Sequence, residues 1–135
     1  MWIALDDTDV GNGCKHYLPG SHHWGERRPA TFSGGGAPSA REEALPPLDL
    51  SRAAREAQPV PVRAGEAIAH HPLVWHMSPI NTSARHRRAW STVWVSSESR
   101  WDTEHAVHPF NYTLRPTQGA LVRGDLFPQF PATSG

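Results

Sequence analysis

Short apolar runs separated by polar turns dominate the pattern of hydrophobic and polar positions along this chain. The first run, residues 2–5, is followed by aspartates and a Gly-Asn-Gly turn, and a second run covers residues 14–18. Asn-Gly between two apolar runs is a strong signal for a β-hairpin, because both residues tolerate positive φ. The pattern therefore predicts two strands joined as a hairpin, with Pro19 to His22 ending the second strand.

A stretch of different composition follows, from residue 25 to residue 58. Gly, Pro, Ala, Arg and Glu dominate it, and its Gly-Gly-Gly and Pro-Pro runs exclude a continuous helix or strand. We interpret it as a long loop excursion over one mouth of the fold. Within it, residues 51–57 favour two helical turns with Ser51 as the N-cap.

Strand signals return after the loop. Apolar runs at residues 59–63, 67–70, 72–76 and 88–95 are separated by Gly, Pro and polar turns. Several short strands with this punctuation are typical of an all-β sandwich or barrel. The tail, residues 96–135, has no clear period and predicts irregular structure against a sheet edge.

Length and charge narrow the class of protein. The chain has 135 residues, which predicts one domain, 1–135, and its 13 basic and 13 acidic residues leave no net charge. Neither a nucleic-acid partner nor a membrane surface is therefore indicated. No apolar run approaches the ~20 residues of a membrane span and no signal peptide is visible, so we expect a cytoplasmic protein. The single cysteine, Cys14, excludes internal disulfides and lies in an apolar run, which favours a buried structural thiol.

His76 has the best position for chemistry among the nine histidines. It ends an apolar run, and a polar loop leads from it to Arg87, eleven residues further on, where the next strand pattern begins. In a hairpin of that length the two side chains can point into one cavity, where an imidazole can hold iron or zinc and an arginine can clamp a carboxylate. A histidine at a strand end and an exposed loop arginine explain the same pattern, so both interpretations stay open here.

Two other metal hypotheses are weaker. One is a zinc site formed by three histidines, His16, His22 and His76. The other is a site for a hard cation formed by three aspartates, Asp6, Asp7 and Asp9, although a polar turn after a strand explains these aspartates better.

Five short motifs stand in order between Trp2 and Trp94. They are Trp-Ile-Ala-Leu-Asp-Asp at 2–7, Asn-Gly-Cys at 12–14, Leu-Pro-Gly-Ser-His at 18–22, Gly-Glu at 65–66 leading through His-Pro-Leu to His76, and Ser78 with Asn-Thr-Ser at 81–83 and Arg-Arg-Ala at 87–89. In order and spacing these motifs resemble the phytanoyl-CoA dioxygenase family. Glu66 stands where the family more often has Asp.

The resemblance implies part of a double-stranded β-helix, or jelly roll, that binds non-haem Fe(II) and 2-oxoglutarate and hydroxylates a small organic molecule. By position, His76 matches the family's distant iron-binding histidine, and Arg87 matches the residue that pairs with the far carboxylate of 2-oxoglutarate. Ser78 stands where a hydroxyl assists that arginine, and Trp2 where a ring packs near the cosubstrate. The resemblance thus implies one metal ligand and three cofactor-binding residues.

The iron site is incomplete in this sequence. The family binds iron with a His-x-Asp pair and a distant histidine, but none of the nine histidines has a carboxylate two residues after it. Three hypotheses follow. The chain is the C-terminal part of a dioxygenase whose pair lies upstream of Trp2; it is a degenerate, non-catalytic jelly roll that binds a small ligand; or a partner chain completes its sheets and its site.

The missing strands also predict how the isolated chain behaves. In the family, two further strands would pair with those of His76 and Arg87, so two sheet edges should be open to another chain. We expect the 135-residue protein to self-associate and to melt without a sharp transition. Sedimentation velocity and calorimetry would check this, and a monomer with a sharp thermal transition would contradict it.

Overall fold

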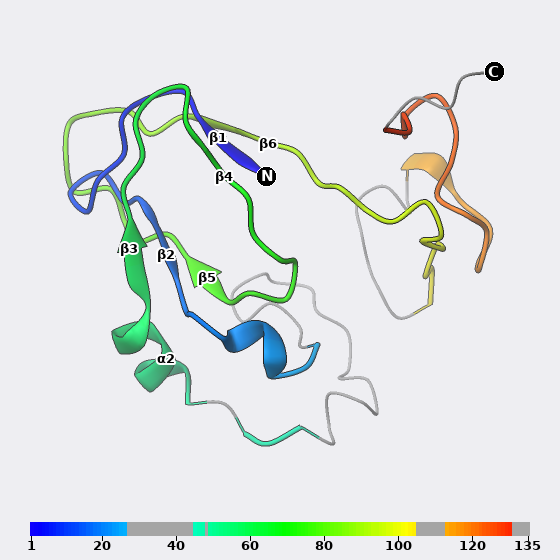
Figure 1. Ribbon diagram of the computed structural model, residues 1–135, viewed down its shortest axis with the longest axis horizontal. Coiled ribbons are helices and arrows are strands. Elements are labelled where there is room, and N and C mark those ends of the chain that lie inside the picture. The colour runs from blue at the N-terminus through cyan, green and yellow to red at the C-terminus, as the bar shows by residue number, and fades with distance from the viewer. Residues whose placement is uncertain (27–44, 48, 105–112, 131–135) are drawn as a thin grey trace. The chain divides into compact units, whose positions relative to one another are not determined.

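The computed structural model describes residues 1–26, 45–47, 49–104 and 113–130 (Figure 1). Most of the predicted 25–58 loop and the histidines at 105 and 108 lie outside these residues. The described chain forms two compact units, one holding the residues up to 93 and the other those from 94 onward. The prediction of a single domain stays a prediction.

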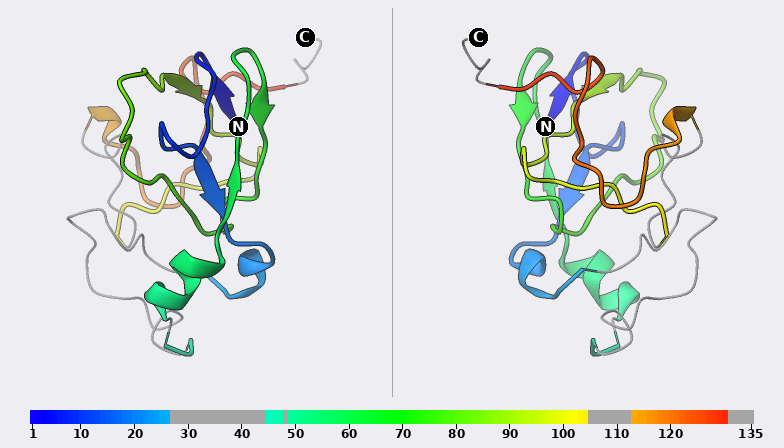
Figure 2. Two further views of the ribbon diagram at one scale, coloured as in Figure 1. Left: turned by 90° about the vertical axis from the view of Figure 1, so that its left-hand side faces the viewer. Right: turned by 90° about the vertical axis from the view of Figure 1, so that its right-hand side faces the viewer.

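Two small antiparallel sheets form the first unit. The first sheet has the order β4-β1-β6, from strands Ala67–Ile68, Trp2–Ala4 and Ala89–Ser91, and the second has the order β3-β2-β5, from strands Gln58–Val60, Lys15–Tyr17 and His76–Met77. In Figures 1 and 2 the β1 sheet lies at one end of this unit and the short helices at the other. The all-β prediction is confirmed.

The predicted hairpin is wrong. β1 and β2 lie in different sheets, where β1 pairs with β4 and β6, and β2 pairs with β3 and β5. Gly13 does have the positive φ, 78°, that the Asn-Gly signal implies. Asn12 does not share this positive φ, so only the glycine half of the signal holds, and the chain uses the turn to cross from one sheet to the other.

The inner side of the unit lies between the two sheets. On β1 the side chains of Trp2 and Ala4 are buried, whereas Trp90 on the opposite face of the same sheet is 65% exposed. On β2 the buried residue is Tyr17. Its hydroxyl lies 3.0 Å from Nδ1 of His70, which follows β4, so this contact joins the two sheets on their inner side.

Two helical elements follow the strands. The 3-10 helix Ser21–His23 ends the β2 segment, and α2, Leu50–Glu56, precedes β3. The predicted cap Ser51 is wrong: Asp49 is the N-cap, and its carboxylate accepts a hydrogen bond from the backbone N–H of Arg52 at 2.9 Å. Aspartate serves as well as serine there, because either side-chain oxygen can satisfy a free backbone N–H of the first turn. Within the described residues, no helix is long and apolar enough to span a bilayer.

The strand of His76 differs from the prediction. Residues 72–74 form a turn, closed by the Val74 N–H donating to the carbonyl oxygen of His71 at 3.0 Å, so His76 begins β5 instead of ending a strand. Pro72 explains the shift, since it lacks the N–H that a paired strand needs and suits a turn.

The second unit is mainly irregular, as the tail was predicted to be. One short antiparallel contact pairs Arg100 with Leu121, and the backbone N–H of Trp101 donates to the carbonyl of Ala120 at 2.8 Å. The Trp101 ring packs edge-on against Phe127, with ring centroids 5.6 Å apart.

Buried residues surround the crossing from β1 to β2. Cys14 is fully buried, as predicted, and burial raises the pKa of its thiol. Next to it, Gly13 lies against the segment after β5: a Cβ on Gly13 would come within 2.5 Å of the carbonyl oxygen of Pro79. The crossing can therefore hold only a glycine at this position.

We expect Gly13→Ala to be much more destabilising than Gly20→Ala. Both glycines have a φ of 78°, so each substitution costs about 1–2 kcal/mol for the left-handed backbone. Only at Gly13 does the new methyl group meet another backbone, which adds about 1–3 kcal/mol, whereas nothing lies within 4 Å of a Cβ at Gly20. Urea unfolding of the two variants would check this, and equal losses would contradict the close approach.

Candidate functional site

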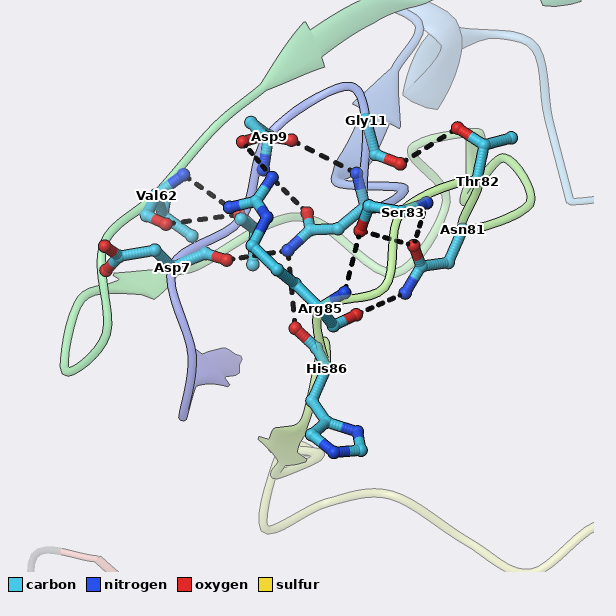
Figure 3. Close-up of polar contacts among 11 residues, drawn as sticks. Asp7, Asp9, Gly11, Val62, Asn81, Thr82, Ser83, Arg85 and His86 are labelled. Carbon is cyan, nitrogen blue, oxygen red and sulfur yellow. Dashed lines mark hydrogen bonds and ion pairs between the residues drawn. The ribbon is translucent and has the colours of Figure 1, made fainter.

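A buried asparagine joins the turn after β1 to the segment that leads into β6. The side chain of Asn12 is fully buried, and its Oδ1 accepts from the backbone N–H of Asp9 at 2.8 Å. Its Nδ2 donates to the carbonyl oxygens of Asp7 at 2.8 Å and of His86 at 3.4 Å. Figure 3 shows the two loops side by side around these contacts. Asn12 thereby fixes the position of the residue immediately before Arg87.

Further bonds hold the same two loops together. The Arg85 guanidinium pairs with the Asp9 carboxylate, and both the backbone N–H and the hydroxyl of Thr82 donate to the carbonyl of Gly11 at 3.1 Å (Figure 3). One residue beyond Arg87, Arg88 makes two side-chain bonds to Asp6, at 2.7 and 3.0 Å. The segment between β5 and β6 is therefore bonded to the turn after β1 at several points from Thr82 to Arg88.

These contacts occupy the aspartates that were considered for a hard cation. Asp6 and Asp9 pair with arginines, and Asp7 accepts from the backbone N–H of Ala64 at 2.8 Å. The polar-turn interpretation of these residues fits the structure better than a metal site.

Two of the sequence-derived candidates belong to the first sheet. Trp2 is buried on the inner face of β1. Arg87 stands two residues before Ala89, which pairs with the buried Ala4. Arg87 precedes β6, and if the alternation of side chains continues back from Ala89, it directs Arg87 toward the same inner face. Arg87 is half-buried there.

The other two candidates belong to the second sheet. His76 on β5 lies opposite Tyr17 on β2, with ring centroids 5.6 Å apart. Ser78 comes directly after β5 and is exposed, as His76 is. The Nδ1 of His76 lies 2.9 Å from the carbonyl oxygen of Val74. A carbonyl can only accept, so Nδ1 carries the proton and Nε2 keeps a lone pair for a metal ion.

The proposed zinc triad is separated by the strand register. His16 is the direct neighbour of Tyr17 on β2 and faces the opposite side of the sheet from His76. Among the described residues, no group of three or more His, Cys, Asp or Glu side chains could hold a metal ion. The described chain therefore offers His76 for iron but not the second imidazole and the carboxylate of a complete facial triad.

Sequence reasoning missed two residues near His76. The ring of His70 lies 4.8 Å from that of His76, and burial, followed by the charge of His76, lowers the pKa of His70. Lys15 stands two residues before Tyr17 and is half-buried; burial, followed by the charge of Arg87, lowers the pKa of its ammonium group. The alternation of the Lys-His-Tyr sequence was the available signal, but only the strand pairing shows which face is the inner one.

A pocket of about 330 Å³ lies in the second unit. Apolar side chains form most of its wall, with one arginine and one aspartate; they include Trp101, Leu114, Leu126, Phe127, Arg123 and Asp125. It contains none of the candidate residues and no histidine, so the inner face of the first unit is the stronger candidate site.

Comparison with known proteins agrees with this choice. The sequence model of the family described as phytanoyl-CoA dioxygenase (PhyH) matches residues 1–89. The chain belongs to the phytanoyl-CoA dioxygenase family. The match includes all four candidate residues, Trp2, His76, Ser78 and Arg87.

Two relatives of this phytanoyl-CoA dioxygenase family member have similar sequence identity to it. A phytanoyl-CoA dioxygenase domain-containing protein 1 homolog from Caenorhabditis elegans is 34% identical over 127 residues, which cover 83% of this chain and 42% of the relative. The Bos taurus phytanoyl-CoA dioxygenase domain-containing protein 1 is 33% identical over 122 residues, covering 84% of this chain and 41% of the relative. The chain thus spans well under half of the curated relatives that it matches.

A solved structure supports the fold. The non-haem α-ketoglutarate-dependent carbocyclase SnoK from nogalamycin biosynthesis superposes with a TM-score of 0.66 at 30% identity, covering 94% of this chain and 46% of that one. The jelly-roll prediction is confirmed by this neighbour and by the two antiparallel sheets of the first unit.

We expect the Asp6–Arg88 pair to make stability depend on acid pH. Hydrogen bonds from the Arg88 side chain and backbone lower the pKa of Asp6 from 3.8 to about 2. Because the folded pKa is the lower one, the contribution is fully present above 3.8 and is lost as the pH falls through about 2. Thermal midpoints of the wild type should therefore fall across this window more than those of Asp6→Asn.

The control is Glu98→Gln, since the Glu98 carboxylate makes no ion pair among the described residues. It should keep the acid response of the wild type. If Asp6→Asn also kept the full response, the ion pair would not be the source.

Proposed function

We propose that this chain carries the cosubstrate-binding part, and one iron ligand, of a non-haem Fe(II)/2-oxoglutarate-dependent dioxygenase that hydroxylates a small organic molecule. The observation that carries the proposal is the strand register, which puts the exposed His76 opposite the buried Tyr17 in one sheet and the half-buried Arg87 just before a strand of the other sheet, two residues from Ala89. The PhyH family match and the α-ketoglutarate dependence of SnoK support it.

Arg87 binds the carboxylate of 2-oxoglutarate that lies away from iron. A guanidinium presents two parallel N–H groups, which match the two oxygens of a carboxylate, and its half-buried position strengthens the pair by excluding water. The Ser78 hydroxyl adds a donor beside it, and the buried Trp2 ring forms an apolar wall.

His76 is the iron ligand that this sequence offers. Its Nδ1–H is fixed by the Val74 carbonyl, which orients the ring and directs Nε2 outward to the ion. Bound Fe(II) supplies the oxygen chemistry of this class of enzyme. Since the sequence has no His-x-Asp pair, the remaining ligands have to come from outside these 135 residues, either from a longer form of the protein or from a second chain.

The alternative is a non-catalytic jelly roll that uses the same interior to bind a small ligand. The missing His-x-Asp pair favours it. The two functions differ in one observable: only the dioxygenase releases CO₂ from 2-oxoglutarate in an iron-dependent reaction.

We expect Arg87→Ala to weaken 2-oxoglutarate binding to the metal-free chain by about 2–4 kcal/mol, roughly 30- to 1000-fold, because it removes a charge-assisted pair from a partly dry site. Isothermal titration calorimetry measures this directly. The matched control is Arg55→Ala, which removes an exposed arginine from α2 and should leave the affinity unchanged.

The iron ligand is tested by the same binding measurement together with an assay of 2-oxoglutarate decarboxylation. His76→Ala should leave metal-free 2-oxoglutarate binding nearly intact and should abolish iron-dependent decarboxylation in any longer form that contains a His-x-Asp pair. If Arg87→Ala bound 2-oxoglutarate as tightly as the wild type, the proposal would be wrong. Full binding with no turnover in such a longer form would favour the non-catalytic alternative.

A further inference from the structure

Lys15 is the only lysine of the chain, and it lies on the inner side of the first unit. On β2 it stands two residues before the buried Tyr17, so both side chains lie on the same face. The ammonium group is half-buried, although lysine is a residue that proteins normally leave in water. Its position therefore needs a reason.

A second cation, Arg87, acts electrostatically on Lys15. Asn12, three residues before it, donates a hydrogen bond to the carbonyl of His86, the residue just before Arg87. The turn that leads into Lys15 is thus bonded to the segment that leads into Arg87, and the charge of Arg87 contributes to lowering the pKa of Lys15. Two like charges in a partly dry place are unfavourable unless an anion lies between them.

Among the described residues, no carboxylate forms an ion pair with Lys15 or Arg87. The ion pairs of the described residues join Arg52 to Glu56, Arg85 to Asp9 and Arg88 to Asp6. Three arginines are thus matched with carboxylates, whereas Lys15 and Arg87 pair with none within the part of the chain that the structure describes. An unmatched pair of cations on an inner face is the arrangement expected of an anion-binding site.

The pairing of β2 with β5 locates Lys15 relative to His76. Tyr17 lies opposite His76, and His16 lies opposite Met77, so continuing the antiparallel pairing brings Lys15 level with Ser78. Lys15 is therefore displaced along the sheet from His76 by two residues, about 6.8 Å, toward Ser78. A five-carbon diacid can span this distance with one end at the imidazole and the other at the ammonium.

We infer that Lys15 is a positioning residue for 2-oxoglutarate, whose ammonium group binds, together with the Arg87 guanidinium, the carboxylate that lies away from iron. This inference rests on the proposed function and adds a second cation to it. Two cations favour a carboxylate over a neutral group at this end, so the site should select diacids over acids that have one carboxylate.

The experiment measures binding of glutarate and of 2-oxoglutarate to the metal-free chain. Glutarate has the same two carboxylates but no oxo group, so its binding reports the clamp alone. We expect Lys15→Met to weaken both by about ten-fold or more, as for loss of a charge-assisted bond. Lys15→Arg should restore most of the affinity, and Arg55→Ala should not change it.

Stability separates this role from a structural one. Because the folded protein disfavours the charged form of Lys15, Lys15→Met should raise the thermal midpoint while it lowers the affinity for glutarate. A lysine kept only for structure would lower the midpoint when replaced. Opposite changes in stability and affinity are therefore the expected signature.

A direct probe needs no substitution. Reductive methylation with ¹³C-formaldehyde labels only Lys15 and the amino group of Met1, which is bonded to the Thr92 carbonyl. Adding glutarate should shift the Lys15 methyl signal in the NMR spectrum and leave the Met1 signal in place. A stationary Lys15 signal at saturating glutarate would overturn the inference.

The outcomes distinguish this inference from the proposed function. If Arg87→Ala weakens binding but Lys15→Met does not, the role of Lys15 is overturned and the 2-oxoglutarate site stands. If neither variant weakens binding, both are overturned. If inorganic phosphate binds as tightly as glutarate and competes with it, the pair is a general oxyanion site and the diacid assignment is wrong.

Discussion

The burial of one amide side chain, that of Asn12, is the constraint on which the first unit depends. With no exposed surface, it satisfies a backbone N–H of its own turn and two carbonyls, one of them from a segment more than seventy residues away. Removing it would leave three backbone groups in part-buried positions without this partner and would open a space where the buried amide had been. The turn that Asn12 organises leads directly into Lys15, and the segment that it reaches leads directly into Arg87.

Two sheets that share no strand-to-strand hydrogen bonds are thus held in register by a polar contact between loops. The apolar contribution is small on this side, since the buried set around β1 and β2 comprises few residues, among them Trp2, Ala4 and Tyr17. The relative positions of the imidazole on one sheet and the guanidinium on the other therefore depend on hydrogen bonds and ion pairs more than on packing. Such contacts are directional, which suits the precise positioning that the proposed binding of a diacid requires.

How much of this was visible in the sequence depends on whether a feature is local. The turn at 64–66 is a local feature, and Gly65 does have a positive φ of 88°. The pairing of β1 is not local: Asn-Gly favoured a hairpin, but burial of Trp2 against later strands decided the partner. His76 and Arg87 could be singled out from the strand pattern and their spacing, and the family's motifs gave them roles and added Ser78 and Trp2, whereas Lys15 required the strand pairing.

The Asn12-Gly13 pair also has a consequence for the chemical lifetime of the protein. In a flexible chain, the nitrogen of a glycine that follows asparagine attacks the side-chain amide, and the resulting succinimide opens to aspartate or isoaspartate. The fold opposes this ageing reaction, because the Asn12 amide is held by three partners and the Gly13 N–H is directed to the carbonyl of Val10. Each unfolding event removes that protection. A carboxylate formed at Asn12 would then face the carbonyls of Asp7 and His86 without a proton to donate, so a molecule that has deamidated while unfolded would not regain the same crossing between its sheets.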